Sequence, residues 1–227
     1  MQEIKRKLLV VVGLTCAGKG YLLRKLIALG LGVTESDMGD IIRHLKRCDP
    51  NFANKVNQKQ KSGAFCADDL VNHLATDNLE ELSKRPIVYL SGYPRTFTQL
   101  NHFLELPIVD SHDVSVIHIN TPQNICIKRA EADQRGRDDD NGTSVQQKLS
   151  DYNSETRYVI DELRKIFPSS EINGQETDKK ALDLIIEQGL QAFVDLSQVS
   201  DETKEEYDFS KIEEFQENQL SEVQFTI

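Results

Sequence analysis

The chain has 227 residues, enough for one sizeable α/β domain, and its 38% hydrophobic and 28% charged content is typical of a soluble globular protein. A net charge of −10 argues against broad nucleic-acid binding, and no apolar stretch approaches the roughly 20 residues that a membrane-spanning helix needs. Residues 1–7 run directly into an apolar stretch, which leaves no room for a signal peptide. The four cysteines include no Cys-x-x-Cys pair, so we expect reduced thiols and a cytoplasmic location.

The first predicted element is a buried strand over residues 8–12, which a glycine-bracketed loop follows. Gly13 and Gly18 enclose four residues, Lys19 comes next, and apolar residues at helical spacing begin at Leu22. This order is typical of a phosphate-binding P-loop, in which backbone N–H groups and the helix N-terminus hold an anion while the lysine contacts the outer phosphates. A glycine-rich turn with a surface lysine is the plainer alternative. The predicted ATP-binding residues of this stretch are Gly13, Cys16, Ala17, Gly18, Lys19, Gly20 and Tyr21.

The residues after the lysine narrow the class of P-loop. The general motif has Ser or Thr directly after the lysine, where this chain has Gly20 followed by Tyr21. Lys-Gly at this point resembles the nucleoside monophosphate kinases of the adenylate kinase family, whose loop usually runs Gly-Lys-Gly-Thr. Tyr21 is unusual even within that family.

Residues 36–43 predict the start of a helix, with Asp37 or the serine before it as the cap. Asp40 and Arg43 alone would be an exposed pair on that helix. The stretch resembles the family's monophosphate-binding helix, in which Gly-Asp, two hydrophobic residues and an arginine follow one another and the arginine holds the acceptor phosphate. The resemblance implies that role for Arg43. It also places Met38 at the acceptor site, where adenylate kinases tend to have Thr and pyrimidine kinases a small residue.

A polar patch over residues 51–62 leads to a segment that resembles the family's Gly-x-Leu-Val-x-Asp-Glu sequence. In the family this segment holds the acceptor base, which implies that Phe65 and Cys66 line the base pocket. Taken alone, Phe65 would be an ordinary core residue. A helix is predicted over residues 70–82, with Asp68 and its neighbouring aspartate in the first turn.

The strand predicted at residues 86–90 is followed by a motif of the acceptor site. The family carries Asp-Gly-Phe-Pro-Arg and, four residues later, Asn or Gln. Ligands of open α/β sheets bind at the carboxyl ends of the strands, where this motif lies. The resemblance implies that Arg95 grips the acceptor phosphate and that Gln99 hydrogen-bonds the acceptor base. The matching residues are Gly92, Tyr93, Pro94, Arg95 and Gln99.

Ser91 stands where the family has an aspartate that orients water around the magnesium ion. A serine still forms hydrogen bonds, but it brings no negative charge to a divalent cation. We therefore expect no direct protein ligand for Mg²⁺, which would be held through the nucleotide phosphates with Ser91 in contact only through water.

A charged segment after the next strand is the predicted lid. Residues 114–119 form that strand, and a helix begins after Thr121 and Pro122. In the family a lid closes here over the phosphates, and its arginines stabilise charge on the transferring phosphoryl group; alone, the segment would be a charged, solvated loop. Arg129, Arg137, Asp139 and Asp140 match the short-lid pattern, Asp133 and Lys148 stand where arginines are expected, and Arg135 lies near enough to substitute for the first of these.

The C-terminal part predicts an amphipathic helix over residues 152–166, a short strand at 171–174 and a closing helix at 181–193. From residue 195 the resemblance ends in an acidic extension that still contains aromatic residues. A wholly disordered tail would be poorer in aromatics, so the extension either packs on the domain or docks a protein partner.

The resemblance covers residues 7–193 and implies an α/β P-loop NTPase fold, with a five-stranded parallel sheet flanked by helices. The predicted organisation is a kinase-like domain over 1–194 followed by an extension over 195–227. Within the domain, an acceptor-binding insert is expected near 36–80 and a lid near 130–142.

The implied activity is transfer of the γ-phosphoryl of ATP to a nucleoside monophosphate, with Mg²⁺. Gln99 makes AMP the first expectation, with UMP or CMP as alternatives. A nucleotide-binding protein with attenuated activity also stays open, because Tyr21, Ser91, Asp133 and Lys148 fall at phosphate or magnesium positions. The predicted catalytic residues are Lys19, Arg95, Arg129 (which also contacts ATP), Arg137 and Lys148, and the predicted acceptor-binding residues are Met38, Arg43, Phe65, Cys66, Gly92, Arg95 and Gln99.

Overall fold

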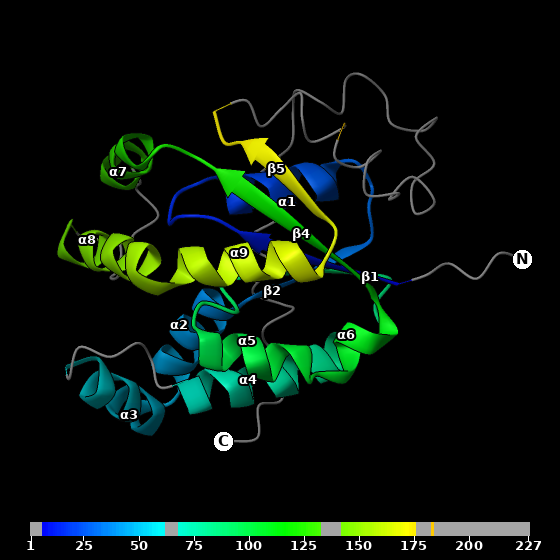
Figure 1. Cartoon of the computed structure of the whole chain (residues 1–227). Helices are drawn as coiled ribbons and strands as arrows, with labels where there is room; N and C mark the ends of the chain where they lie inside the picture. The colour runs from blue at the N-terminus through cyan, green and yellow to red at the C-terminus, as the bar shows by residue number, and fades with distance from the viewer. Residues whose placement is uncertain (1–5, 62–67, 133–141, 176–182, 184–227) are drawn as a thin grey trace, which may run out of the picture.

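A five-stranded parallel sheet forms the centre of the molecule in the computed structural model, which describes residues 6–61, 68–132, 142–175 and 183 (Figure 1). The strands lie in the order β2-β3-β1-β4-β5. All four pairings are parallel, so the carboxyl ends of the strands meet at one edge of the sheet. The strands are β1 (Lys7–Val12), β2 (Val33–Asp37), β3 (Ile87–Ser91), β4 (Asp113–Asn120) and β5 (Ser169–Asn173).

Helices cover both faces of the sheet, because the side chains of the central strand alternate between two apolar clusters. Leu8 and Val10 of β1 pack in one cluster, and Leu9 and Val11 pack in the other. α1 (Lys19–Ala28) packs on the second cluster, together with Cys126 of α7 (Gln123–Ala132). In Figure 1, α4 and α5 accordingly lie below the sheet, and α1 lies behind β4 and β5 in the upper part of the molecule. The first cluster receives α2 (Met38–Cys48), α3 (Pro50–Lys61), α4 (Asp68–Leu82), α5 (Phe97–Leu104), α6 (Pro107–Ser111) and α9 (Arg157–Ile166).

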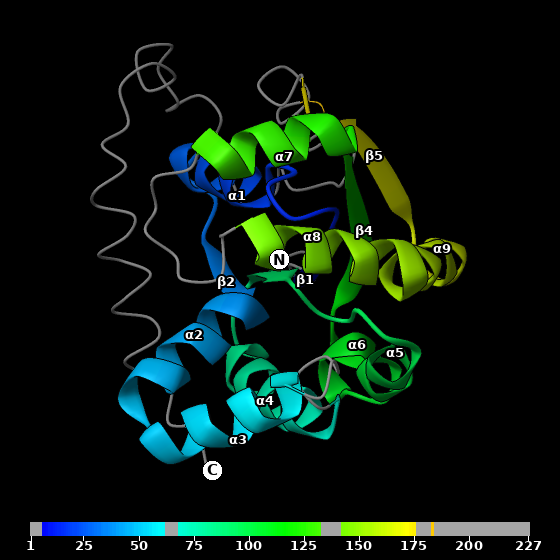
Figure 2. The same cartoon turned by 90° about the vertical axis from the view of Figure 1, so that its left-hand side faces the viewer.

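A smaller apolar cluster joins two helices to the loop between β1 and α1. Ala130 of α7 packs with Val145 and Leu149 of α8 (Gly142–Asp151), and partly buried Leu14 and Cys16 of the loop lie against them. Figure 2 shows α7 and α8 one above the other on this side of the molecule. This packing brings α8 close to the β1–α1 loop.

The predicted α/β fold with a parallel five-stranded sheet is confirmed, but the sequence patterns alone did not identify every element. β2 was not predicted, and its last two residues are those that we expected only as a helix cap. Its sequence, Val-Thr-Glu-Ser-Asp, has little apolar content, yet Ser36 is buried and its hydroxyl donates a hydrogen bond to Oδ1 of Asn78 at 2.5 Å. A polar strand of this kind gives no hydrophobic signal.

Two further elements differ from the expectation. α3 occupies most of the polar patch at 51–62, and it is anchored by Phe52 and Val56, one helical turn apart and both buried. The helix expected over 152–166 begins with a π-helical turn (Tyr152–Thr156) before α9. Within the described ranges, every helix is too short or too polar to cross a bilayer.

Several predictions fall outside the described residues. These are the closing helix at 181–193 apart from residue 183, the acidic extension at 195–227, most of the predicted lid, and the predicted base-pocket residues Phe65 and Cys66. Cys16, Cys48 and Cys126 are free thiols, as expected.

Candidate active site

The β1–α1 loop has the backbone geometry that its glycines predict. Gly13 has φ 150°, and a Cβ there would lie 2.6 Å from the carbonyl oxygen of Ile119, so a side chain would collide with the backbone of β4. Gly18 adopts a left-handed conformation with φ 114° and forms the N-cap of α1. As a glycine it has no side chain to occupy the N–H groups of the first helical turn. These groups and the helix dipole form the kind of N-terminus that binds anions.

Lys19 folds back over this loop from the first turn of α1. Its Nζ donates hydrogen bonds to the carbonyl oxygens of Gly13, at 3.0 Å, and Leu14, at 2.8 Å. Burial and, after it, the positive charge of Arg95 lower the pKa of Lys19 to about 8, although the negative charge of Asp37 acts in the opposite direction. Lys19, Arg95 and Asp37 therefore belong to one electrostatic group, although they come from different elements of the fold.

The side of the loop facing β4 and β5 is fixed by hydrogen bonds to main-chain oxygens. The hydroxyl of Thr121 donates to the carbonyl of Ala17 at 2.8 Å. Arg129 of α7 donates to the same carbonyl at 3.2 Å and, through its other terminal nitrogen, to the carbonyl of Gly174 at 2.9 Å. Arg129 thus lies beside the loop and connects it to the end of β5.

The residues predicted to bind the acceptor lie around the N-terminus of α2. Arg43 pairs with Asp40, with 2.5 Å between Nη2 and Oδ1. Arg95 donates from Nε to the carbonyl of Gly92 at 2.9 Å. Gly92 has φ 77°, and a Cβ there would lie 3.6 Å from the backbone nitrogen of Met38, so this turn packs closely on the start of α2. The fold therefore brings together Met38, Arg43, Gly92 and Arg95, which the sequence analysis assigned to the acceptor site.

Ser91, the last residue of β3, is hydrogen-bonded to a carboxylate of the neighbouring strand. Its hydroxyl donates a hydrogen bond to Oδ2 of Asp37, the last residue of the neighbouring strand. The other carboxylate oxygen of Asp37 accepts from the backbone N–H of Asp40 at 2.9 Å, which makes Asp37 the N-cap of α2. Burial raises the pKa of Asp37, but the hydrogen bond from Ser91 and the positive charge of Arg43 outweigh that effect and hold it below its usual value.

Gln99 is 2% exposed, and its amide is engaged at both ends. Its Oε1 accepts from the backbone N–H of Arg95 at 2.8 Å, and its Nε2 donates to Oδ1 of Asp68 at 2.9 Å. In this arrangement Gln99 ties the Arg95 turn to the start of α4. Sequence reasoning assigned Asp68 only to the first turn of a helix, and it did not predict this contact.

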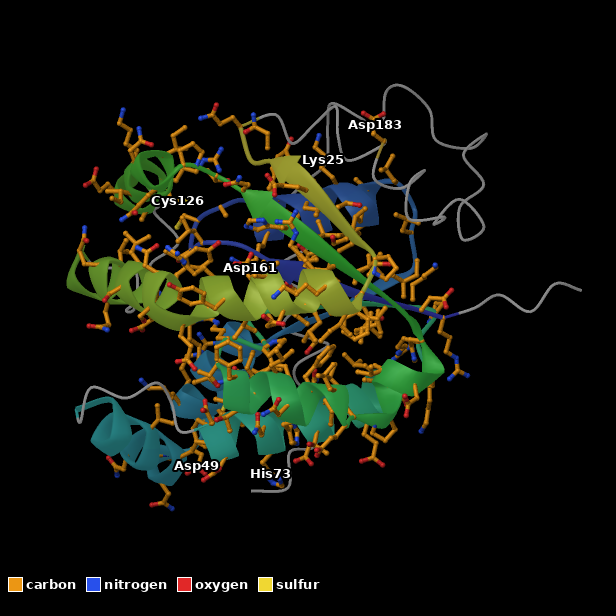
Figure 3. All side chains as sticks on the ribbon, viewed as in Figure 1. Lys25, Asp49, His73, Cys126, Asp161 and Asp183 are labelled. Carbon is orange, nitrogen blue, oxygen red and sulfur yellow. The ribbon has the colours of Figure 1, made fainter. Side chains whose placement is uncertain are left out.

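Tyr21 and Lys148, two departures from the family pattern, lie on different helices, α1 and α8. Nζ of Lys25, on α1, lies 5.4 Å from the ring centroid of Tyr21, so the ring packs along α1 (Figure 3 labels Lys25). Lys148 lies on α8, next to Leu149, which contributes to the small cluster shared with the loop. The remaining lid residues, Asp133, Arg135, Arg137, Asp139 and Asp140, are outside the described residues.

His118 lies on β4, within the strand predicted at residues 114–119. Its Nδ1 is 3.4 Å from Glu171 on β5, and desolvation lowers its pKa. Among the residues that the structure describes, no cluster of three or more His, Cys, Asp or Glu side chains has the arrangement of a metal site.

Comparison with known proteins gives a family for this arrangement. The adenylate kinase family model matches residues 11–166, more than half of the chain. The chain belongs to the adenylate kinase family. The matched region begins within β1 and ends with α9, so it contains the β1–α1 loop, the turn around Arg95 and α8.

Individual members of the family are similar to this chain over most of their length. An adenylate kinase of Clavibacter michiganensis subsp. michiganensis is 29% identical over 169 residues, which cover 73% of this chain and 84% of that protein. An adenylate kinase of Encephalitozoon cuniculi is 29% identical over 171 residues, which cover 75% of this chain and 91% of that protein. Adenylate kinase 1 of Nostoc sp. is 27% identical over 174 residues, covering 76% and 92%.

Proposed function

We propose that this protein is a nucleoside monophosphate kinase that transfers the γ-phosphoryl of ATP to a nucleoside monophosphate, with AMP as the first candidate. One observation carries the proposal: Lys19, at the start of α1 after the β1–α1 loop, and Arg95 of the β3–α5 turn both follow strands at the carboxyl edge of the sheet, and the positive charge of Arg95 helps to lower the pKa of Lys19. A phosphate donor held by the loop and a phosphate acceptor held by the arginine would then lie side by side.

The roles of the residues follow from their positions. Lys19 and the N–H groups of α1 would hold the phosphates of ATP, and Arg43 and Arg95 would hold the phosphate of the acceptor. Arg129 lies beside the loop and would stabilise charge on the transferring group, together with Lys148 and Arg137. In this chemistry the protein positions the reactants and provides charge, and Mg²⁺ bound with ATP would neutralise phosphate charge. Met38 and Gln99 would contact the acceptor side, together with Phe65 and Cys66.

The proposed organisation is a kinase domain over 1–194, with an acceptor-binding insert near 36–80 and a lid near 130–142. Lid closure would exclude water from the transferring phosphoryl group, which prevents loss of the phosphoryl to hydrolysis.

The test is ADP formation from ATP and Mg²⁺ in a coupled assay, with AMP, UMP, CMP, GMP and dTMP supplied separately. We expect turnover with one acceptor in clear preference to the others, and loss of turnover in Lys19→Ala. Lys165→Ala, on the exposed end of α9, is the matched control and is expected to retain activity. Turnover with UMP or CMP instead of AMP would assign the chain to the pyrimidine acceptors.

A second candidate, a nucleotide-binding protein with attenuated transfer, is favoured by Tyr21. The ring of Tyr21 packs toward Lys25 at the position where the family's loop usually has threonine. Binding of ATP by calorimetry without turnover of any acceptor would support this candidate. A large gain in turnover in Tyr21→Thr, but not in Tyr21→Phe, would identify the missing hydroxyl as the cause.

A further inference from the structure

Asp37 and Ser91 form a matched pair at the carboxyl edge of the sheet. They are the last residues of β2 and β3, and they are Cα partners in the parallel register of these strands. Partners in a parallel pair project their side chains to the same side of the sheet, and neighbouring strands lie about 4.8 Å apart. The Ser91 hydroxyl donates directly to the Asp37 carboxylate. A carboxylate is therefore present one strand away from the position where the family has its aspartate.

The Asp37 carboxylate lies among cations that the proposed reaction uses. Nη2 of Arg43 lies 3.9 Å from Oδ1 of Asp37, and the positive charge of Arg95 helps to lower the pKa of Asp37. The negative charge of Asp37 in turn raises the pKa of Lys19. Arg43 is held more closely by Asp40, at 2.5 Å, so Asp37 is not its nearest carboxylate. The partly buried carboxylate of Asp37 therefore interacts with the lysine that would hold ATP and with the arginines that would hold the acceptor.

Capping of α2 does not by itself account for an aspartate at this position. The cap uses Oδ1, which accepts from the N–H of Asp40 at 2.9 Å, and serine or asparagine caps a helix about as well. The side chain of Asp37 is partly buried, and a neutral cap would avoid the partial desolvation of a carboxylate. The charge of Asp37 therefore calls for a separate explanation.

We propose that Asp37 takes over the role of the acidic residue that Ser91 replaces, and that its carboxylate orients water molecules around the Mg²⁺ ion that accompanies ATP. Mg²⁺ keeps several of its waters when it binds with a nucleotide, and carboxylate oxygens suit it as partners. Ser91 acts as a positioning residue, because its hydroxyl fixes the carboxylate at the end of β2. This inference rests on the proposed binding of ATP.

The test exchanges the two side chains. Isothermal titration calorimetry would measure the affinity for a non-hydrolysable ATP analogue with and without Mg²⁺, in the wild type, Asp37→Ser, Ser91→Asp and the double variant Asp37→Ser/Ser91→Asp. We expect Asp37→Ser to reduce the gain in affinity that Mg²⁺ provides by about tenfold, since the ion loses a charged partner while the cap is kept. We expect the double variant to restore that gain to within about threefold, because the charge returns to the edge of the sheet.

Ser91→Asp alone is not expected to increase the gain in affinity that Mg²⁺ provides. It places a second carboxylate directly against the first, and two carboxylates at that distance do not both stay ionised. Glu35→Gln, which removes another carboxylate from β2, is the matched control and is expected to keep the wild-type dependence on Mg²⁺. Thermal melting of each variant verifies that it is folded.

The outcomes separate this inference from the proposed function. A wild-type dependence on Mg²⁺ in Asp37→Ser, or a double variant no better than Asp37→Ser, would overturn the role of Asp37 and leave ATP binding intact. Absence of ATP binding by the wild type, with and without Mg²⁺, would instead overturn the proposed function, and this inference with it.

Discussion

The hydroxyl of Tyr89 on β3 donates a hydrogen bond of 2.6 Å to the main-chain carbonyl of Lys19, the first residue of α1. Tyr89 is completely buried, and this bond connects the centre of the sheet to the helix that would hold phosphate. We predict that Tyr89→Phe lowers the free energy of unfolding by about 1 kcal/mol, the usual net value of one internal hydrogen bond. Urea denaturation measures the change, and Tyr158→Phe, at an exposed position, is expected to have almost no effect.

The pH dependence of Tyr89 provides a second prediction. Burial raises the pKa of this phenol well above its usual value, so the folded protein keeps the proton at a pH where the unfolded chain loses it. Tyr89 therefore stabilises the fold fully below about pH 10, the ordinary pKa of a tyrosine, and this contribution is lost as the pH rises through the folded-state value. Ultraviolet titration counts the phenols that have lost their protons. The difference in this count between the wild type and Tyr89→Phe should be smaller in the folded protein, at a pH below the folded-state pKa of Tyr89, than after alkaline unfolding. An equal difference in both conditions would contradict the shift.

Lys19 should take up a proton when ATP binds near pH 8. Its pKa is lowered to about 8, and the phosphates of ATP would favour its charged form. Calorimetry in two buffers with different heats of ionisation should therefore detect uptake of about 0.5 proton at pH 8 and almost none at pH 6.5. Lys19→Met should show no such uptake, whereas Lys165→Met should behave as the wild type.

The same shift has a consequence for stability, with a sign opposite to that of Tyr89. Between pH 8 and the ordinary lysine pKa, the unfolded chain holds more protons at Lys19 than the folded protein does. The contribution of this group to stability therefore rises with pH across that interval. Chemical denaturation at a series of pH values measures how the free energy of unfolding changes with pH. If this change is identical in Lys19→Met and the wild type, the lowered pKa of Lys19 is contradicted.

Gly174, after β5, should tolerate no side chain. A Cβ at this position would overlap the Thr121 hydroxyl and lie 2.8 Å from the carbonyl oxygen of Ala17. We expect Gly174→Ala to destabilise the protein by about 3 kcal/mol and to weaken ATP binding, because it separates the end of β5 from the β1–α1 loop. Gly32→Ala is the control, since a Cβ there would lie 3.9 Å from Pro86 at ordinary contact distance. Equal melting temperatures of the two variants would contradict the prediction.

Replacement of Arg43 should weaken binding of the acceptor nucleotide and leave binding of ATP almost unchanged. We predict that Arg43→Gln raises the KM for the nucleoside monophosphate by about 10- to 100-fold, the loss expected for one charge-assisted phosphate contact, and leaves the affinity for ATP within about twofold. Steady-state kinetics with each substrate varied in turn measure both effects. Arg47→Gln, on the exposed side of the same helix, should change neither KM. A similar loss of ATP affinity in Arg43→Gln would place this arginine at the donor site instead.

The parts of the fold that the sequence predicted are those with a strong local signal. β1 and β3 are runs of buried apolar residues, and the glycines around Lys19 are required by the backbone itself. β2 and α3 were not predicted, because β2 is polar and α3 shows only two anchoring apolar residues. Their structure depends on tertiary contacts, such as the bond from Ser36 to Asn78, which local propensity does not contain.

In the candidate site, too, the residues with a local sequence signal were predicted, and the contacts that depend on tertiary structure were not. The sequence indicated Lys19, Arg43 and Arg95 individually, because each lies in a motif. It gave no sign that Ser91 would bond to Asp37, 54 residues earlier, or that both ends of the Gln99 amide would be occupied. Such pairs arise from the register of neighbouring strands and from the packing of loops.

The strand order has a consequence for how the protein is made. β1 and β2 leave the ribosome first, but β3 lies between them in the sheet, and Ile119 of β4 packs against Gly13. A nascent chain that ends before residue 87 therefore contains none of the strand pairings of the described sheet. We expect such a chain to expose its apolar strands to chaperones during synthesis, and the nucleotide to find a formed binding loop only after β4 has been added.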